Sequence, residues 1–313
     1  MRVVVTGGAG FIGSHVVDAL LPKGIDVAVI DNLSTGHRKN LSRNAKLYQV
    51  DLRDRENVFK VFREFKPTHV SHQAAQASVK VSVDAPNYDA EVNVLGGLNV
   101  LDAAREVGVG KVVFASTGGA IYGEVPEGEQ ANEDWPVQPK SPYAASKAAF
   151  ETYLEVYQNN YGLEYVTLRY GNVYGPRQDP HGEAGVVAIF TQRMLGGKPI
   201  ILFARRKPGD SGCVRDYVYV GDVVAANLVA LERDFRGVYN VGTGIGRSTL
   251  EVYDCIASTL DRVGTIEYAP RRPGDIEVSM LDASRLSGLG WSPEIEFEEG
   301  IRRTVAWFRD TQR

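Results

Sequence analysis

A glycine-rich turn between an apolar strand and an amphipathic helix constrains this chain most. Val3–Thr6 is a short β-branched run, and Gly7, Gly10 and Gly13 follow it directly. The stretch Phe11–Leu21 then places its apolar residues on one helical stripe. Glycines at these spacings permit a tight turn, a close approach of backbone N–H groups to phosphate, and close packing of helix on strand. The start of the chain therefore predicts a strand–turn–helix unit that binds the pyrophosphate of a dinucleotide.

An acidic residue stands where such a unit needs one. Asp31 ends the second predicted strand, Val27–Ile30, about 20 residues beyond the glycine turn, where a carboxylate accepts hydrogen bonds from the adenosine ribose. The same charge would repel a 2′-phosphate, so the residue favours NAD over NADP. The alternative interpretation is that Asp31 is a turn or cap residue.

The first half of the chain alternates short apolar runs with longer amphipathic stretches. This pattern is typical of a parallel sheet that is covered by helices on both faces. We therefore predict an α/β fold with a doubly wound parallel sheet. Besides those already named, the expected strands are Leu47–Val50, His69–His72, Val112–Ala115 and Tyr165–Arg169, and the expected helices are Val92–Val107 and Ala144–Tyr157.

The regular alternation ends after Arg169. Loops rich in Gly, Pro and Asp follow, and Val218–Leu231 and Val238–Val241 resemble a helix and a strand that return to the main sheet. We expect residues 1–171, with returning segments near 216–242, to form the NAD-binding domain. Residues 172–313 should form a smaller C-terminal lobe that mainly binds substrate.

Composition excludes several classes of function. Apolar residues make up 43% and charged residues 24%. The net charge is −4, whereas a protein that binds nucleic acid carries an excess of basic residues. No stretch approaches the roughly 20 apolar residues that span a bilayer. The first strand leaves no room for a signal peptide, so we expect a cytoplasmic protein with no membrane partner. Cys213 and Cys255 lie far apart and predict two free thiols and no metal site.

A tyrosine and a lysine lie four residues apart in the sequence YAASK. Because positions i and i+4 share a face of an α-helix, Tyr143 and Lys147 can serve one site. Tyrosine is a weak base at neutral pH unless a nearby positive charge stabilises the phenolate. Lys147 supplies such a charge. Ser141 and Pro142 fit a helix start, which places Tyr143 in the first turn.

Taken together, the motifs resemble the extended short-chain dehydrogenase/reductase family, and most closely its UDP-glucose 4-epimerase branch. The resemblance covers nearly the whole chain and implies a Rossmann-type sheet, an NAD cofactor, a UDP-sugar substrate and a homodimer. The motifs that carry it are VTGGAGFIG, DNLS, DLRD, HQAAQ, FASTGGAIYG, SPYAASK, RYGNVYGPRQ, VRDYVYVGDV, YNVGTG, RRPGD and LGWSP.

The resemblance also implies a role for individual residues. Tyr143 would be the catalytic base, Lys147 would lower its pKa and hold the nicotinamide ribose, and Thr117 would bond the sugar 4-hydroxyl. The implied cofactor contacts are Gly7, Gly10, Phe11, Ile12, Gly13, Asp31, Asn32, Leu33, Asp51, Leu52, Ala74, Ala75, Asn93, Lys147 and Tyr170, and the implied substrate contacts are Asn172, Phe203, Arg215, Arg272, Asp275 and Ser279.

The segment between Phe114 and Tyr122 is one residue longer than in many relatives. Counting from the strand assigns the catalytic hydroxyl to Thr117, whereas counting back from Tyr122 gives Gly118, which has none. Thr117 is therefore the prediction, and Ser116 is the alternative.

The resemblance implies epimerisation at C4 of a UDP-hexose through a 4-keto intermediate. Related 4,6-dehydratases carry an Asp-Glu pair after the catalytic threonine, where this chain has Gly118 and Gly119, so elimination of water would lack its proton carriers. The motifs also fit a decarboxylase of the same family or a non-catalytic NAD-sensing module. Ser279 matches a position where a small residue admits N-acetylated sugars. The alternative is that this serine simply lies in the strand-like stretch Ile276–Leu281 and that a loop elsewhere closes the pocket.

Overall fold

The computed structural model of the chain describes residues 1–181, 185–272 and 275–311, and these form two compact units. Gly118–Lys140 falls within the predicted first domain but lies with the second unit, because the backbone N–H groups of Val125 and Ala131 donate to the carbonyl oxygens of Val278 and Met280. The first unit consists of Met1–Thr117, Ser141–Arg169 and Val224–Tyr239, and the second of Gly118–Lys140, Tyr170–Val223 and Asn240–Arg313.

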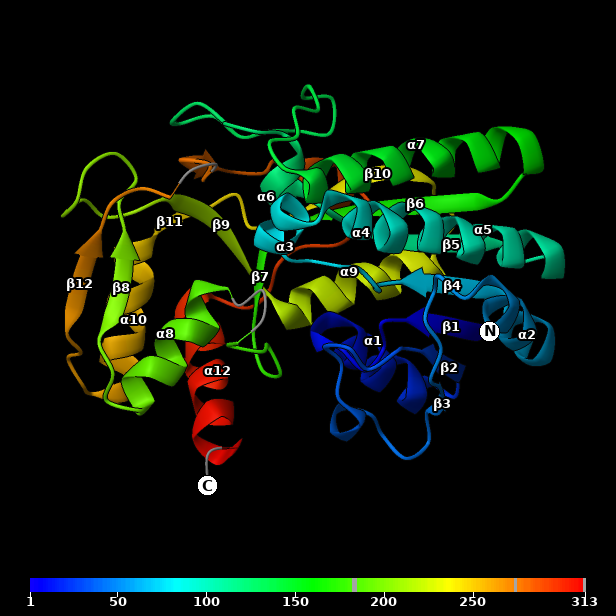
Figure 1. The fold of residues 1–313 in the computed structure, drawn as a ribbon, viewed down its shortest axis with the longest axis horizontal. Helices are drawn as coiled ribbons and strands as arrows, with labels where there is room; N and C mark the ends of the chain where they lie inside the picture. Colours follow the sequence, from blue (N-terminus) through cyan, green and yellow to red (C-terminus); the bar gives the residue numbers. More distant parts are fainter. Residues whose placement is uncertain (182–184, 273–274, 312–313) are drawn as a thin grey trace. The chain divides into compact units, whose positions relative to one another are not determined.

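A seven-stranded sheet organises the first unit, with strand order β10-β6-β5-β4-β1-β2-β3 (Figure 1). β1 pairs in parallel with both β2 and β4, so the chain order reverses between β1 and β4, where ligands bind in sheets of this kind. This confirms the predicted doubly wound α/β fold. The strands are β1 (Arg2–Thr6), β2 (Asp26–Ile30), β3 (Lys46–Tyr48), β4 (His69–His72), β5 (Lys111–Thr117), β6 (Glu164–Tyr170) and β10 (Gly237–Val241).

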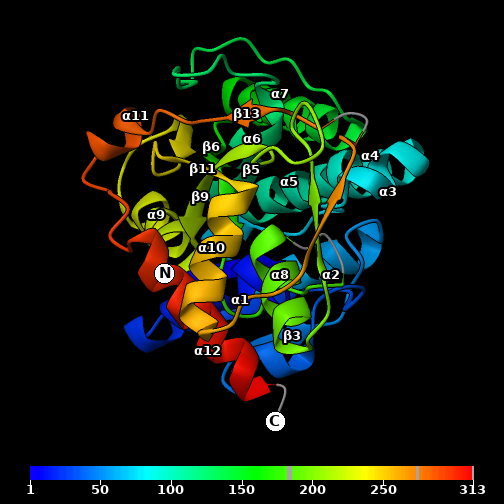
Figure 2. The ribbon, with the colours of Figure 1, turned by 90° about the vertical axis from the view of Figure 1, so that its left-hand side faces the viewer.

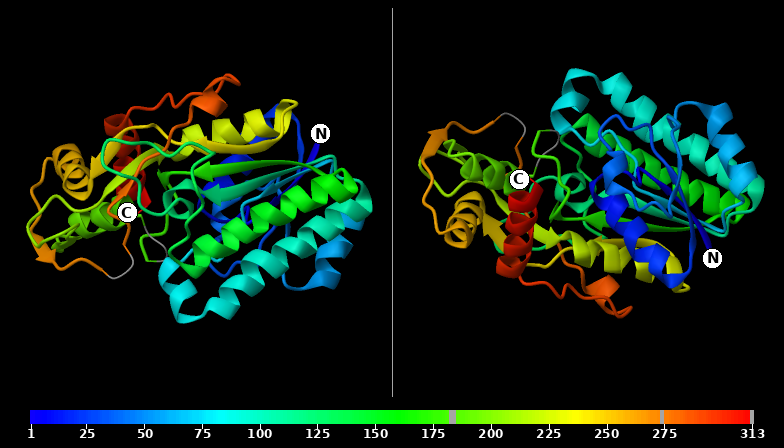
Figure 3. Two further views of the ribbon diagram at one scale, coloured as in Figure 1. Left: turned by 90° about the horizontal axis from the view of Figure 1, so that it is seen from above. Right: turned by 90° about the horizontal axis from the view of Figure 1, so that it is seen from below.

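Helices cover both faces of this sheet. Figure 3 shows α5 and α7 along one face and α1 and α9 along the other. The predicted helix Val92–Val107 begins differently, since its first residues belong to a π-helical turn, η3. The helices are α1 (Phe11–Leu20), η1 (Leu21–Lys23), η2 (Arg38–Asn40), α2 (Arg55–Phe65), α3 (Val79–Asp84), α4 (Pro86–Ala90), η3 (Glu91–Leu95), α5 (Gly96–Val107), α7 (Pro142–Tyr161) and α9 (Val220–Glu232).

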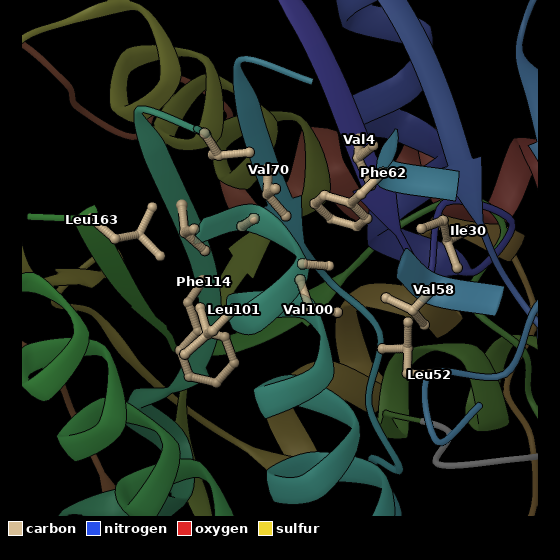
Figure 4. Close-up of a cluster of buried hydrophobic side chains, with 14 of the residues drawn as sticks. Val4, Ile30, Leu52, Val58, Phe62, Val70, Val100, Leu101, Phe114 and Leu163 are labelled. Atoms are coloured by element: carbon tan, nitrogen blue, oxygen red, sulfur yellow. The ribbon is translucent and has the colours of Figure 1, made fainter. Parts of the chain in front are cut away.

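The core of the first unit lies between the sheet and α2, α5 and α7. Figure 4 shows Val4 and Val70, from β1 and β4, among side chains that include Phe62 and Leu101 from α2 and α5. Burying a side chain of this size stabilises the fold by about 1.5–3 kcal/mol. The β1 and β4 strand ends that frame the glycine loop are therefore fixed by a continuous apolar core.

The second unit contains two smaller sheets. β9 lies at the centre of one and pairs with β7, β11 and β13, while β8 pairs with β12. Figure 2 shows α8, α10 and α12 beside one another. The sequence predicted that Val218 belongs to a helix, but it lies in β9. The elements are α6 (Gly118–Ile121), β7 (Asn172–Tyr174), α8 (Val186–Leu195), β8 (Ile200–Phe203), β9 (Val214–Tyr219), β11 (Gly246–Ser248), α10 (Thr249–Leu260), β12 (Ile266–Ala269), β13 (Val278–Ser279), α11 (Ser284–Ser287) and α12 (Phe297–Thr311).

No helix within the described ranges is both long enough and apolar enough to cross a membrane.

Candidate active site

The loop after β1 is shaped to hold an anion. A Cβ on Gly13 would lie 2.2 Å from the carbonyl oxygen of Gly7, so only glycine fits at position 13. α1 begins at Phe11 with Gly10 as its N-cap, and no side chain of the described chain caps this end or places an acid in its first turn. The N–H groups of the first turn, which includes Ile12, have no intrahelical partners and can donate to a phosphate. The loop therefore fits the pyrophosphate of NAD.

Asp31 holds the glycine loop in place. Its Oδ2 accepts a hydrogen bond of 2.9 Å from the N–H of Ala9, and its Oδ1 accepts one of 2.8 Å from the N–H of Leu33. A Cβ on Gly36 would lie 2.9 Å from both carboxylate oxygens. Because a carboxylate offers about four acceptor positions, both oxygens can still accept from ribose hydroxyls. The sequence indicated the ribose role but not this loop-binding role.

The predicted adenosine contacts continue from β2 to the end of β3. Asn32 donates a hydrogen bond of 3.0 Å to Oδ2 of Asp51. The guanidinium of Arg53 donates to both oxygens of Asp51, and these bonds hold the pKa of that carboxyl well below its usual range. Leu52 is buried in the core cluster. Asp51 is thus a fixed acceptor, whereas most of the Leu52 side chain packs inside the unit.

The segments that follow β1 and β4 are held together by Thr6. Its hydroxyl oxygen accepts a hydrogen bond of 3.2 Å from the N–H of Ala74 and lies 2.7 Å from Nδ1 of His72. A Cβ on Gly7 would lie 2.7 Å from the Cα of Ala74. This close approach places Ala74 and the half-buried Ala75 beside the glycine loop, at the point where the strand order reverses.

Asn93 lies on the π-helical turn and is hydrogen-bonded to the segment that follows β4. Its Oδ1 accepts from the N–H of Gln76 at 2.8 Å, and its Nδ2 donates to the carbonyl oxygen of Gln76 at 2.9 Å. Single π-helical turns occur often at functional sites. Asn93 therefore fixes the chain just beyond Ala75.

Tyr143 and Lys147 lie on one face of α7, as predicted from their spacing. Ser141 caps the helix by accepting a hydrogen bond from the N–H of Ala144, and Pro142 occupies its first turn. The Lys147 ammonium lies 5.9 Å from the centre of the Tyr143 ring and donates a hydrogen bond of 2.8 Å to the carbonyl oxygen of Ala115. Burial lowers the pKa of Lys147 to about 8. A desolvated positive charge beside a phenol favours the phenolate.

Ser116 and Thr117 end β5 and point to opposite sides of the strand. The Ser116 hydroxyl donates to Oε1 of Glu151, which forms a buried ion pair with Arg169. Thr117 is the last residue of the strand and is buried to 9% exposure. Neighbouring strand residues point to opposite sides, so Thr117 does not share the position of Ser116. This arrangement leaves the threonine as the candidate catalytic hydroxyl.

In the second unit, Asn172 packs closely on Gly119. A Cβ on Gly119 would lie 3.1 Å from Oδ1 of Asn172, which is tighter than an ordinary contact. Asn172 begins β7, two residues after the buried Tyr170 that ends β6. The absence of a side chain at position 119 therefore allows the observed position of the Asn172 amide.

The remaining predicted substrate residues form two groups in the second unit. The Arg272 guanidinium lies 4.7 Å above the centre of the Phe203 ring and donates to both carboxylate oxygens of Asp275, at 2.9 and 3.2 Å. Arg215, on β9, lies directly opposite Ser279 of β13 in the sheet register. Ser279 is buried to 3% exposure. The first group joins an aromatic face with a guanidinium, and the second pairs an arginine with a small residue on the neighbouring strand.

Comparison with known proteins decides the family. The sequence model described as the NAD dependent epimerase/dehydratase family matches residues 3–242. The chain belongs to this family. It is 46% identical to the UDP-glucose 4-epimerase of Mycolicibacterium smegmatis, over 99% of each chain. It superposes on the Thermus thermophilus UDP-glucose 4-epimerase in complex with NAD with a TM-score of 0.96, at 63% identity and 99% coverage of each chain. For the Thermotoga maritima UDP-glucose 4-epimerase with UDP-glucose, the TM-score is 0.94, at 47% identity and full coverage of both chains.

Several residues that position the site of this family member could not be recognised from the sequence. Thr6 and Glu151 hold loop and strand ends near the predicted residues, and Asp89 accepts hydrogen bonds from Asn93 and Ser146. A threonine in a strand and acids on helices show no distinctive spacing. Only their burial in the structure identifies them.

Proposed function

We propose that this protein is a UDP-glucose 4-epimerase, an NAD-dependent isomerase that inverts C4 of a UDP-hexose through a 4-keto intermediate. The observation that carries the proposal is the buried Lys147 ammonium beside Tyr143, at the carboxyl end of β5. Full-length similarity to the epimerases of three bacteria, at 46–63% identity, supports it.

The chain's residues divide the chemistry between them. Tyr143 removes the proton of the sugar 4-hydroxyl, and Lys147 stabilises the phenolate by its charge. The Thr117 hydroxyl donates to the 4-oxygen and holds it for this transfer. NAD, which the glycine loop and Asp31 would hold, would supply the hydride acceptor for C4 and the hydride that restores the sugar. Because the proton and the hydride both return to the substrate, no net oxidation occurs.

Five residues of the second unit are proposed to hold the UDP group. Arginine forms bidentate hydrogen bonds to phosphate, which suits Arg215 and Arg272, and the Phe203 ring offers an apolar face. Asp275 accepts from Arg272 and can also accept from sugar hydroxyls. Asn172 completes the set with an amide.

Other reactions of this family have less support. A dehydratase needs carboxyl side chains after the threonine, and any side chain at position 119 would press on the amide of Asn172. The second catalytic candidate is a decarboxylase. A non-catalytic NAD-sensing module would not need a buried lysine beside Tyr143, because burying an ammonium costs free energy.

The direct test incubates the purified protein with UDP-galactose and measures UDP-glucose. We expect the two sugars to reach equilibrium without consumption of added NAD. Release of a 4-keto-6-deoxy sugar would assign the protein to the dehydratases instead, and loss of CO2 from UDP-glucuronate would assign it to the decarboxylases. NAD binding without turnover of any of these substrates would support the sensing module.

We further propose that the enzyme accepts N-acetylated UDP-sugars because Ser279 is small. Ser279→Tyr should abolish the interconversion of UDP-N-acetylglucosamine and UDP-N-acetylgalactosamine through steric overlap while sparing UDP-glucose. Met280→Leu, a change next to it that conserves volume, is the control. If the wild-type enzyme rejects the N-acetylated pair, Ser279 is not the residue that sets breadth.

The enzyme is proposed to act as a homodimer that pairs through the helices expected at Val92–Val107 and Ala144–Tyr157. In the structure these are η3 with α5, and α7, against which α3 also packs. Val83, Leu95, Tyr153, Val156 and Tyr161 on these elements are 40–60% exposed, and such groups of apolar side chains mark interfaces. Val156→Glu should yield monomers in sedimentation, whereas Val263→Glu, at the 89% exposed Val263, should not. A wild-type monomer would contradict the proposal.

Domain organisation and compartment complete the proposal. The parts of residues 1–171 and of the returning segments near 216–242 that lie in the first unit would bind NAD. The second unit, which holds most of residues 172–313 together with Gly118–Lys140, would mainly bind the nucleotide sugar. Both cysteines, Cys213 and Cys255, are free thiols, which is typical of a reducing cytoplasm.

A further inference from the structure

Three charged side chains lie buried in and around the first half of α7. Lys147 is 3% exposed and Glu151 8% exposed, one helical turn apart, and Asp89 of α4 is fully buried. A buried charge is tolerated only when it is paired or strongly hydrogen-bonded. The partners of the two carboxylates therefore decide which of them balances the charge of Lys147.

Glu151 is already paired. Its carboxylate accepts hydrogen bonds from Nε and Nη2 of Arg169, the latter at 2.6 Å, and from the Ser116 hydroxyl. The negative charge of Glu151 is thus balanced by the guanidinium of Arg169.

Asp89 has a different set of partners. Its Oδ2 accepts from the Ser146 hydroxyl at 2.6 Å, and its Oδ1 accepts from Nε2 of Gln76 at 2.7 Å and from Nδ2 of Asn93 at 3.0 Å. These donors are neutral. Three donors directed at its two oxygens suit a carboxylate, which only accepts hydrogen bonds.

The other groups that face Lys147 do not supply a negative charge. His72 on β4 is neutral because burial lowers its pKa to about 3, Tyr143 is a neutral phenol in its ordinary state, and Arg169 on β6 is positive. Because Arg169 compensates the charge of Glu151, the Asp89 carboxylate is left to compensate the charge of Lys147. Asp89 and Glu151 both attract the Lys147 ammonium.

We propose that Asp89 is a positioning residue whose carboxylate keeps Lys147 protonated in its buried site, so that Lys147 can activate Tyr143. The proposal deepens the proposed function, because it rests on the roles of Tyr143 and Lys147 given there. Asp89 also orders Asn93 and Ser146, so its charge and its hydrogen bonds must be tested separately.

Titration of Lys147 measures the charge effect without any turnover. Lysine labelled with ¹³C at Cε gives one NMR resonance per side chain, and Lys147→Met identifies the resonance of interest. Asp89→Asn removes the charge and keeps the shape, so the midpoint of the Lys147 titration should fall by about one pH unit or more. Ser146→Ala removes a hydrogen bond but no charge, and Asp89→Glu retains the charge. Both should leave the midpoint within about half a unit of the wild type.

The pH profile of turnover gives the second readout. As the pH rises, kcat of Asp89→Asn should begin to fall at a lower pH than kcat of the wild type. At pH 6–6.5, where Lys147 of the variant is protonated again, kcat should approach the wild-type value. Asp89→Ser is a second neutral variant, so the test does not depend on the folding of one protein. An unchanged Lys147 midpoint in the neutral variants, or an equal loss of kcat at every pH, would overturn the proposal. If the wild type does not epimerise at all, the proposed function fails, while the titration still decides whether Asp89 controls the charge of Lys147.

Discussion

The phenol of Tyr143 is the group on which the proposed chemistry depends. Tyr143→Phe removes only the ionisable oxygen, so turnover should drop by about 10²-fold or more, as expected for the loss of a positioned base. Bound NAD should be retained, because the ring and Lys147 remain. Initial rates and the cofactor content of the purified variant measure both effects. Tyr153→Phe, at an exposed tyrosine on the same helix, is the control, and near-normal turnover by Tyr143→Phe would remove Tyr143 from its role.

The adjacent hydroxyls of Ser116 and Thr117 should separate by experiment. Thr117→Val conserves volume and removes the hydroxyl that would bond the sugar, so we expect kcat to fall with little change in thermal stability. Ser116→Ala removes a buried donor to Glu151, so the free energy of unfolding should fall by about 1–2 kcal/mol. Paired measurements of kcat and unfolding test this. A larger loss of kcat in the serine variant would exchange the two assignments.

For single residues, the sequence predicts a shared site only where the spacing along one helix places two side chains on the same face. Tyr143 and Lys147 are one helical turn apart, and their proximity follows from helix geometry alone. Asp89 reaches the same cluster from another helix, 58 positions before Lys147, and no local pattern records that meeting. Long-range packing therefore sets the electrostatics of residues that local spacing identifies.

Among the elements, the β1–α1 loop was predictable because its glycines are required by sterics. What the sequence could not indicate is that Asp31, at the end of β2, binds this loop through Ala9. The π-helical turn was also missed, since the apolar spacing of Val92–Val107 does not distinguish it from the α-helix that follows. Both features depend on contacts between elements.

The second role of Asp31 changes what its removal should do. Asp31→Ala leaves the N–H groups of Ala9 and Leu33 without this acceptor and also removes the ribose contact, so we expect NAD to bind about tenfold more weakly or worse. Discrimination against NADP should decrease because the charge that repels a 2′-phosphate is gone. Calorimetric titration with both cofactors measures this, with Asp26→Ala at the opposite end of β2 as the control. Unchanged affinity and selectivity would make Asp31 a turn residue only.

For the whole molecule, the alternation of apolar runs and amphipathic stretches predicted the strands of the parallel sheet, and Val238–Val241 was expected to return to it. The structure places this returning strand beside β6. The alternation did not predict that Gly118–Lys140 leaves the first unit. That segment contains little regular structure, and its place is set by backbone hydrogen bonds to Val278 and Met280, more than 140 residues away in the sequence. Segments with no periodic pattern carry no local signal of their partner.

Unfolding of the whole chain should depend on pH through His72. Burial lowers the pKa of His72 to about 3 in the folded state, against about 6.5 in the unfolded chain, so below pH 6.5 the unfolded chain binds a proton that the folded protein does not. The stability that His72 contributes is complete above pH 6.5 and is lost as the pH falls towards 3, at up to about 1.4 kcal/mol per pH unit. His72→Gln keeps a polar group near Thr6 but does not titrate. Between pH 6.5 and 5.0 the wild type should therefore lose about 2 kcal/mol more than this variant in urea unfolding. Parallel loss of stability in the two proteins would show that His72 accepts its proton while buried.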